Sequence, residues 1–497
     1  MPFQIKPVQK LARYYRFAYI PVLLVLIAAV PSFIIADGGH YAQTPHGNSA
    51  TGVRRDPSLP TGSCAQCHAG HGSSPQDFGL WTANDNSLCF TCHANSLQSY
   101  SGQTLYNASG HATSTSNLDG RPVGRCVQCH NPHGKGDSRG LYANMTDNLE
   151  EENCFNCHGT GIRPTNAVEV RSDTTKPYSH RVGDFERKHD NDAESTSVAV
   201  NPNSRLSGSG RHVECADCHN THQARSNPRA SGSSNIGEMQ LGSWGVRPTY
   251  INSPWSQPTG YTVQRFQDTT NNYEYYLCLK CHSNWAWGNA APYTTDGTPQ
   301  TNIALEINPA NPAYHNVTGQ IPSLVPSEDS VYGNGSPLGY VSPWGPNSQM
   351  GCSDCHAGDP SSTARGPHGS TYNYMLKKRY KAQTGASDNT GTNGTQQDLC
   401  FSCHDWNTYS ASGSGNGTNF RKDSDNLHRM SAHNQNGCGQ CHSAVPHGFN
   451  RKHMIVYVTD GAPYFTGGTK GILSYTHANG GAYNKADCTT TPGCHGN

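Results

Sequence analysis

Residues 64–72 read CAQCHAGHG, and residues 88–93, after a polar connector, read LCFTCH. Each stretch contains C-x-x-C-H, the pattern to which haem c attaches. The two thiols add to the two vinyl groups of one porphyrin, and the next histidine ligates the iron. Two intervening residues let both sulfur atoms reach one edge of the macrocycle, and a single helical turn brings the histidine under the iron. The stretch therefore predicts two haem sites, and His71, three residues after His68, is an additional candidate ligand.

The same pattern recurs along the chain and uses eighteen of the twenty cysteines. We expect two thioether cysteines and one proximal histidine at each site. Numbered in chain order, sites 1 to 9 are Cys64/Cys67/His68, Cys89/Cys92/His93, Cys126/Cys129/His130, Cys154/Cys157/His158, Cys215/Cys218/His219, Cys278/Cys281/His282, Cys352/Cys355/His356, Cys400/Cys403/His404 and Cys438/Cys441/His442.

The two remaining cysteines form a variant of the pattern near the end of the sequence. Five residues separate Cys488 from Cys494 in CTTTPGCH, and His495 follows directly. We interpret this stretch as site 10, with a longer arch between the thiols, and expect ten haem c groups in all. The alternative is a disulfide between the two cysteines.

Other chemistries also use C-x-x-C pairs. Zinc sites, thioredoxin-like dithiols and a set of disulfides in a secreted chain are the alternatives. None of them requires a histidine immediately after every second cysteine, so nine repeats indicate haem attachment.

The composition is poor in the residues that build an ordinary core. Hydrophobic residues are 33% of the chain, which also contains 53 glycines and 31 prolines, whereas about 45–50% apolar residues is usual when glycine is included. The porphyrins must then supply the interior. We predict a mostly irregular fold with short α-helices and little β-structure, built around a stacked haem chain, and we expect folding to require the haems.

The charge balance and the first residues bear on partners and location. Basic and acidic residues number 35 each, so nothing favours nucleic acid or an anionic membrane surface. Basic residues precede an apolar run from Phe17 to Ala36, and the chain turns polar at Asp37. We expect residues 1–36 to be a secretory signal peptide and the mature chain to lack a membrane span. An uncleaved anchor is the alternative.

The sites read as five doubled units. The first motif of most units is followed closely by another histidine, as in CVQCHNPHG, and the second is usually introduced by Leu-Cys or Asn-Cys, as in NCFNCH. In this respect the sequence resembles multihaem c-type cytochromes with doubled C-x-x-C-H motifs. Unit spacing predicts haem units one and two in residues 37–165, unit three with aromatic, Pro- and Gly-rich inserts in 166–345, and units four and five in 346–497. For the inserts we favour extended loops over short β-structure.

Histidines outside the motifs are the candidate distal ligands. Of 26 histidines, sixteen are not proximal, and only seven methionines are present, so we expect each iron to have two histidine ligands. Each unit offers one histidine upstream of the first motif and one downstream, and we expect the downstream one to serve the second haem of its own unit. The candidates are His46, His71, His111, His133, His212, His222, His315, His368, His433 and His447. The alternatives are His180 or His189 for His212, His428 for His433, and His453 or His477 for the last haems.

The resemblance implies an electron carrier rather than an enzyme, and we predict no catalytic residue. Covalent haem attachment takes place outside the cytoplasm, so we expect an exported protein, extracellular or on the cell surface, with the periplasm as the alternative. The expected partners are other redox proteins or extracellular acceptors. Copies that polymerise into a filament are a further expectation, with His40 and His46 as candidate ligands between copies. The alternative function is a reductase of nitrogen or sulfur oxyanions with one open haem.

Overall fold

The computed structural model describes somewhat more than half of the chain. The described residues are 41–69, 77–94, 102–118, 121–134, 151–161, 164, 166–182, 213–288, 300–319, 339–345, 348–380, 398–411, 418, 420–422, 425–430, 433, 436–466, 470–476 and 487–492. The predicted signal peptide, His40, His71, His189, His212, His477, Cys494 and His495 lie outside them.

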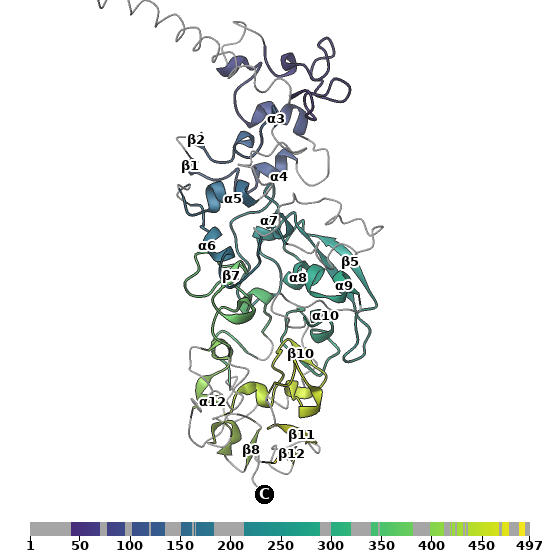
Figure 1. Cartoon of the computed structure of the whole chain (residues 1–497), viewed down its shortest axis with the longest axis vertical. Coiled ribbons are helices and arrows are strands. Elements are labelled where there is room, and N and C mark those ends of the chain that lie inside the picture. Colours follow the sequence, from purple (N-terminus) through teal and green to yellow (C-terminus); the bar gives the residue numbers. More distant parts are fainter. Residues whose placement is uncertain are drawn as a thin grey trace, which may run out of the picture. The chain divides into compact units, whose positions relative to one another are not determined.

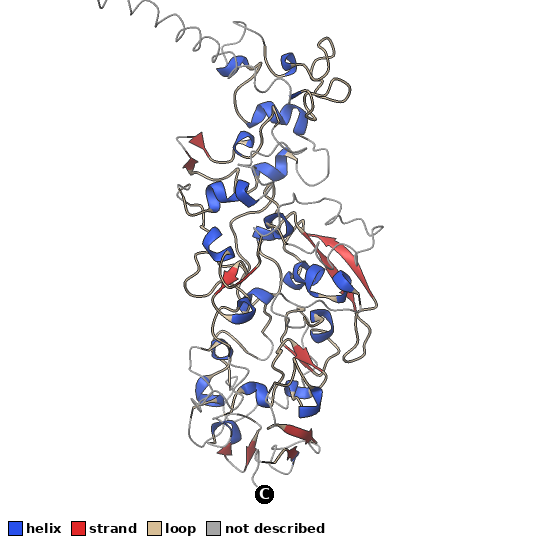
Figure 2. Cartoon of the chain, viewed as in Figure 1, coloured by secondary structure: helices blue, strands red, loops and turns tan. Residues whose placement is uncertain are grey.

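Helices in this part of the chain are short, and most of the backbone is irregular (Figure 2). None of them is long and apolar enough to cross a membrane. The α-helices are α3 (Asn86–His93), α4 (Gln103–Asn107), α5 (Glu151–His158), α6 (Arg171–Thr174), α7 (Cys215–Cys218), α8 (Glu274–His282), α9 (Asn284–Trp287), α10 (Ile303–Glu306) and α12 (Trp406–Tyr409). Single 3-10 turns are η1 (Cys64–Gln66), η2 (Asp77–Gly79), η3 (Cys126–Gln128), η6 (Glu238–Gln240), η7 (Cys352–Asp354), η8 (Asn373–Met375), η9 (Leu399–Ser402), η10 (Leu427–Arg429), η11 (Cys438–Gln440), η12 (Lys452–Met454) and η13 (Val458–Asp460).

The β-structure consists of antiparallel strand pairs, most of them only two residues long. The pairs are β1 (Asn117–Leu118) with β2 (Arg121–Pro122), β3 (Tyr178–Ser179) with β7 (Gly369–Ser370), β4 (Trp244–Thr249) with β5 (Gly260–Arg265), β6 (Ala313–Tyr314) with β10 (Gly448–Phe449), β8 (Arg421–Lys422) with β9 (Asp425–Asn426), and β11 (Ile472–Tyr475) with β12 (Cys488–Thr490). The predicted fold class, irregular with short helices and little β-structure, is confirmed.

Backbone contacts divide the chain into two compact units. The first comprises residues 1–97 and 124–148 and contains sites 1 to 3. The second comprises residues 98–123 and 149–497 and contains sites 4 to 9. The three-part division expected from the motif spacing stays a prediction.

The insert of unit three has an ordinary apolar core. Strands β4 and β5, each six residues long, pair in a hairpin, and helix α8, which ends at His282, packs on β4 (Figure 1). Phe266 and Leu279 are fully buried in the cluster between them. A Cβ on Gly245 would overlap the Tyr276 backbone, so glycine permits α8 to approach the strand this closely. The favoured expectation of extended loops is therefore wrong for this insert, because its alternating apolar residues form a hairpin that packs on the haem-attachment helix.

Replacing the buried Phe266 tests whether this core holds α8. Phe266→Ala leaves a cavity whose cost is about 3–5 kcal/mol. We expect faster hydrogen exchange at the amides of Val246 and Leu279, with exchange around site 1 unchanged. Equal acceleration throughout the chain would contradict a local core, and Val263→Ala, a partly buried position on the same hairpin, is the milder control.

Candidate haem sites

Each described C-x-x-C-H motif lies on a helical turn. At sites 1, 3, 5, 7, 8 and 9 the proximal histidine donates its backbone N–H to the carbonyl of the first cysteine, over 2.8–3.0 Å. At sites 2, 4 and 6 the motif ends the longer helices α3, α5 and α8. Residues three and four apart lie on one face of such a turn, so the two thiols and the imidazole share a side. This is the geometry that attachment to one porphyrin requires.

The second cysteine of a motif lies at the end of its turn, directly before the proximal histidine. Cys92 and Cys281 belong to the last turns of α3 and α8. Cys129 and Cys441 follow η3 and η11, and each donates its backbone N–H to the carbonyl of the first cysteine over 3.2 Å. Cys92 and Cys129 are exposed, whereas Cys281 and Cys441 are partly buried. All four thiols have the backbone position that attachment requires, and a thioether bond at each of them stays a prediction.

Most proximal histidines face a second histidine from a distant part of the chain. A metal–imidazole bond is about 2 Å long, so two imidazoles on opposite sides of one iron hold their ring centroids ~6 Å apart. Eight pairs have centroid separations of 5.8–6.4 Å. They are His93 with His46, His68 with His133, His158 with His111, His282 with His180, His219 with His368, His404 with His315, His356 with His447, and His442 with His428.

Site 3 is characterised by the backbone of its proximal histidine, His130, and by its neighbour site 2. The backbone of His130 has the expected place on its turn, with its N–H 2.9 Å from the Cys126 carbonyl. Burial, followed by His46 and then His130, lowers the pKa of His93, so the imidazole of site 3 lies near that of site 2. The structure thus brings His130 close to His93 of site 2. Ligation of an iron by His130 stays a prediction.

Hydrogen bonds fix the tautomer of many of these imidazoles. Nδ1 lies within hydrogen-bond distance of a backbone carbonyl at His46, His68, His111, His158, His180, His219, His315, His356 and His442. A carbonyl oxygen only accepts, so Nδ1 carries the proton and Nε2 keeps the lone pair that binds a metal. Such second contacts also fix the orientation of the ring.

Burial keeps several of these rings neutral. Desolvation, followed by the neighbouring His447, lowers the pKa of His356 to about 4. Desolvation, followed by His315, does the same for His404, whose pKa is about 4. A neutral imidazole is the form that ligates iron. The paired spacing, the tautomers and the thiols on the same turn all fit a haem with two axial histidines.

The histidines that face the motifs come in adjacent couples. His180 follows β3 and His368 precedes β7, and we call this strand pair the 180/368 ribbon. His315 follows β6 and His447 precedes β10, which we call the 315/447 ribbon. In each ribbon the first imidazole donates to the carbonyl of the proline before the second histidine, Pro367 or Pro446. One short ribbon thus presents two imidazoles to two different sites.

A family model agrees with the motifs. The model of the doubled CXXCH motif matches residues 58–98, 121–162 and 345–408, which contain sites 1 to 4, 7 and 8. The chain is a multihaem c-type cytochrome with doubled CXXCH motifs. No curated protein and no solved structure is detectably similar to it. Its motifs bind haem c covalently.

The couples of the cytochrome follow a rule that crosses unit borders. In units one to four, the upstream histidine faces the second site of its own unit. In units one, three and four, the first site faces the downstream histidine of the following unit, namely His133, His368 or His447. The expectation that a downstream histidine serves the second haem of its own unit is therefore wrong for these residues. The spacing along the chain favoured a local partner, but the turn that carries each of these histidines folds back onto the preceding unit.

The structure also describes several other candidate ligands of the cytochrome. His180, an alternative to His212, faces site 6, and His428, the alternative to His433, faces site 9. His433 has its Nδ1 3.0 Å from the Leu427 carbonyl, and the ring of His222 lies against Tyr106. Cys488 begins β12. Axial ligation by each histidine, and a haem at site 10, remain proposals.

Three proximal histidines hydrogen-bond to left-handed turns. The sequence did not predict these turns. Phe78, Tyr374 and His453 have φ between 56° and 62°, and their carbonyls accept from Nδ1 of His68, His356 and His442. Such backbone costs about 1–3 kcal/mol for a non-glycine residue. In each case the turn aims a carbonyl at the ring. In each case an aliphatic residue two positions later pairs with the proximal histidine, namely Leu80, Leu376 or Ile455.

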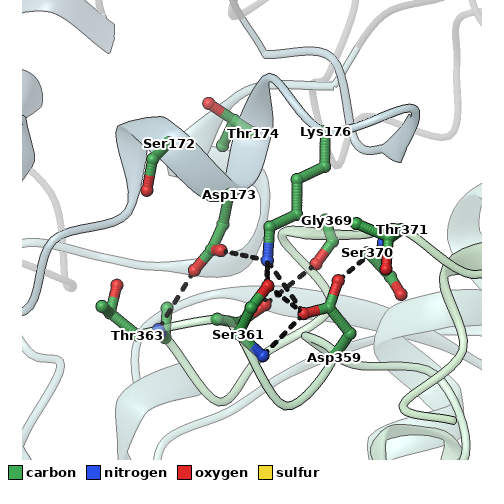
Figure 3. Close-up of polar contacts among 12 residues, drawn as sticks. Ser172, Asp173, Thr174, Lys176, Asp359, Ser361, Thr363, Gly369, Ser370 and Thr371 are labelled. Atoms are coloured by element: carbon green, nitrogen blue, oxygen red, sulfur yellow. Dashed lines mark hydrogen bonds and ion pairs between the residues drawn. The ribbon is translucent and has the colours of Figure 1, made fainter.

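A buried polar cluster holds the 180/368 ribbon of the cytochrome together (Figure 3). The Lys176 ammonium lies 2.9 Å from Asp173 and 3.2 Å from Asp359, and both carboxylates are almost fully buried. Despite burial, hydrogen bonds from Ser361 and Thr371 and the contact with Lys176 lower the pKa of Asp359. The cluster joins the segment before β3 to the loop before β7, which places His180 and His368 together.

Within each compact unit, consecutive sites of the cytochrome are neighbours in space. In the first unit the thiols of Cys89 and Cys126 hydrogen-bond, which joins sites 2 and 3. In the second unit, hydrogen-bonded thiols join sites 6 and 7 through Cys278 and Cys352. Sites 8 and 9 are joined in the same way through Cys400 and Cys438.

Further contacts complete the series in the second unit. A buried ion pair of 3.2 Å between Lys280 and Asp217 joins the attachment turns of sites 6 and 5. Burial, followed by the nearby Cys403 of site 8, raises the pKa of Cys355 of site 7 to about 12. His111, which faces site 4, hydrogen-bonds to the Thr221 carbonyl just beyond site 5. Sites 4 to 9 therefore follow one another in space in chain order.

Removal of the buried ammonium tests the positioning role of the polar cluster. Lys176→Met leaves two buried carboxylates without their cation, at a cost of about 3–5 kcal/mol. We expect the 180/368 ribbon to loosen and the irons of sites 5 and 6 to give a high-spin electron paramagnetic resonance signal.

Arg171→Met is the matched control. Arg171 lies on α6, close to Lys176 in the chain, and pairs with Glu152 at the surface, where such pairs contribute about 0–1 kcal/mol. A Lys176→Met protein with only low-spin iron, or an equal high-spin signal in both variants, would contradict the assigned role.

Removal of one imidazole tests the rule that crosses unit borders. His133→Ala should convert the iron of site 1 to high spin. In a protein whose site 1 has been deleted by Cys64→Ala and Cys67→Ala, the same change should add no high-spin iron. Deletion of site 4 by Cys154→Ala and Cys157→Ala is the control. If His133→Ala loses its effect in that background instead, the histidine serves the second haem of its own unit and the rule is refuted.

Proposed function

We propose that the cytochrome carries electrons along an array of haems, each held by two histidines. The observation that supports this best is the proximity of each attachment site to the next from site 4 to site 9, taken in chain order. Haem iron supplies one-electron redox chemistry when it is bound. The chain's residues would hold successive porphyrin edges next to one another, since the thiols of sites 6 and 7, and those of sites 8 and 9, already touch.

The axial residues support electron transfer rather than substrate chemistry. At eight sites an imidazole stands on the far side of the position that iron would occupy, at the spacing of a six-coordinate centre. Two histidine ligands leave no coordination position for a substrate, and they give lower reduction potentials than a histidine and a methionine. An array of such centres exchanges electrons with redox partners at its surface.

The proposal includes export. Haem c is attached outside the cytoplasm, and the apolar run from Phe17 to Ala36 with its basic flank is typical of a signal peptide. The donors and acceptors would then be extracellular, at the cell surface or periplasmic. Association of copies into a filament would extend the array. Of the two histidines considered for contacts between copies, His46 faces His93 within the chain.

The experiment is a low-temperature electron paramagnetic resonance spectrum of the oxidised protein, with iron quantified against polypeptide. We expect nine or ten irons per chain and low-spin signals only. A high-spin iron whose signal shifts with nitrite or cyanide would overturn the carrier proposal and favour the reductase. Iron far below nine per chain would refute the array.

A further inference from the structure

One axial histidine candidate has a hydrogen-bond acceptor unlike the others. Nδ1 of His447, which faces His356 at site 7, lies 2.7 Å from the Glu306 carboxylate. At His180, His315 and His356 of the same region the acceptor is a backbone carbonyl, and at His428 it is the Thr418 hydroxyl. Nδ1 of His368 is buried without a hydrogen-bond partner. His447 thus differs from these imidazoles in the charge of the group behind the ring.

The surroundings of Glu306 keep it in place as an acceptor. Its side chain is fully buried at the end of α10. Oε2 accepts from His447, and Oε1 accepts from the Tyr464 hydroxyl over 2.9 Å. Burial, followed by Glu306 itself, raises the pKa of Tyr464, so the phenol keeps its proton and donates. Both carboxylate oxygens therefore receive a hydrogen bond, as an ionised carboxylate can.

The backbone fixes the distance between the two side chains. A Cβ on Gly448 would overlap the Glu306 carbonyl, so glycine after His447 allows β10 to pass directly beside the end of α10. Asn311 donates to the same carbonyl over 2.7 Å. The carboxylate is therefore built into the 315/447 ribbon and is not a mobile surface group.

A carboxylate acceptor changes the electronic character of the ring. A hydrogen bond to an ionised group is roughly twice as strong as one to a neutral carbonyl. The bond draws the Nδ1 proton away from the ring and makes Nε2 a more basic ligand. A more basic ligand and a nearby negative charge both favour ferric over ferrous iron, which lowers the reduction potential.

We propose that Glu306 is a positioning residue that makes the haem of site 7 the last to be reduced among sites 4 to 9. The inference rests on the proposed function, because it requires haems with two histidine ligands. Since site 7 lies between sites 6 and 8, its low potential places an energetic step within the array. The height of this step, which electrons cross in either direction, depends on Glu306.

The test is a potentiometric titration of the haem-loaded cytochrome, followed by optical and electron paramagnetic resonance spectra. In Glu306→Gln the midpoint of the last-reduced haem should rise while the other midpoints stay in place, and the low-spin spectrum of one iron should change. His447→Met, which supplies a ligand that raises the potential, should move the same haem and so assign it to site 7. Asp268→Asn, which removes an exposed carboxylate from the haem-free insert, should move none.

Tyr464→Phe gives a second test that keeps the carboxylate. Loss of the phenol donor leaves more negative charge on Glu306, so the same midpoint should fall. An unchanged or lowered midpoint in Glu306→Gln would overturn the inference. If Glu306→Gln fails to load haem at site 7, an unchanged or raised midpoint in Tyr464→Phe overturns it. A wild-type protein with open high-spin irons would instead refute the proposed function, so the two failures are distinguishable.

Discussion

The separation between two imidazoles is the constraint on which the rest of this structure depends. An iron with two axial histidines requires ring centroids ~6 Å apart, and here the two rings come from segments far apart in the chain. His219 and His368 meet this requirement although they lie far apart in the sequence of the second unit. Regular secondary structure contributes little, so the distance is set by turns and their hydrogen bonds. Polar groups of the chain therefore fix the positions of a few imidazoles.

The two ligand ribbons show how such positions are fixed without a conventional core. Strand pairs of two residues are too short to be stable alone. Each is reinforced by a buried charge, Lys176 with its two carboxylates in one ribbon and Glu306 in the other. Each also needs a glycine directly after its histidine, because a Cβ on Gly369 or Gly448 would overlap the neighbouring backbone. Charge pairing and close backbone approach here take the place of apolar packing.

The insert of unit three follows the opposite principle. Its apolar residues bury one another between β4, β5 and α8, and this core ends at a haem-attachment motif. Lys280, within that motif, lies over the Trp244 ring of β4 and pairs with Asp217 of the preceding site. The hairpin is thereby connected to the spacing of sites 5 and 6. A segment without haem can in this way position two haems.

The sequence by itself determined what depends on neighbours along the chain. The spacing C-x-x-C-H identifies thioether cysteines and proximal histidines, because one helical turn brings these residues to one side whatever the rest of the fold. The low apolar content likewise predicted an irregular fold with little β-structure. Histidines such as His46 and His447 were recognisable as candidates from their repeated place in the units.

The tertiary structure alone decided which imidazole faces which site. Such a pair depends on how the chain returns over long distances, so His133 could not be assigned to His68 from spacing, and the left-handed turn at Phe78 left almost no sequence signal. The contact of Glu306 with His447 joins a helix end in the insert to a turn in the last unit, and no local pattern links the two. The sequence was enough to predict the short-range covalent chemistry, whereas the long-range geometry depends on the folded chain.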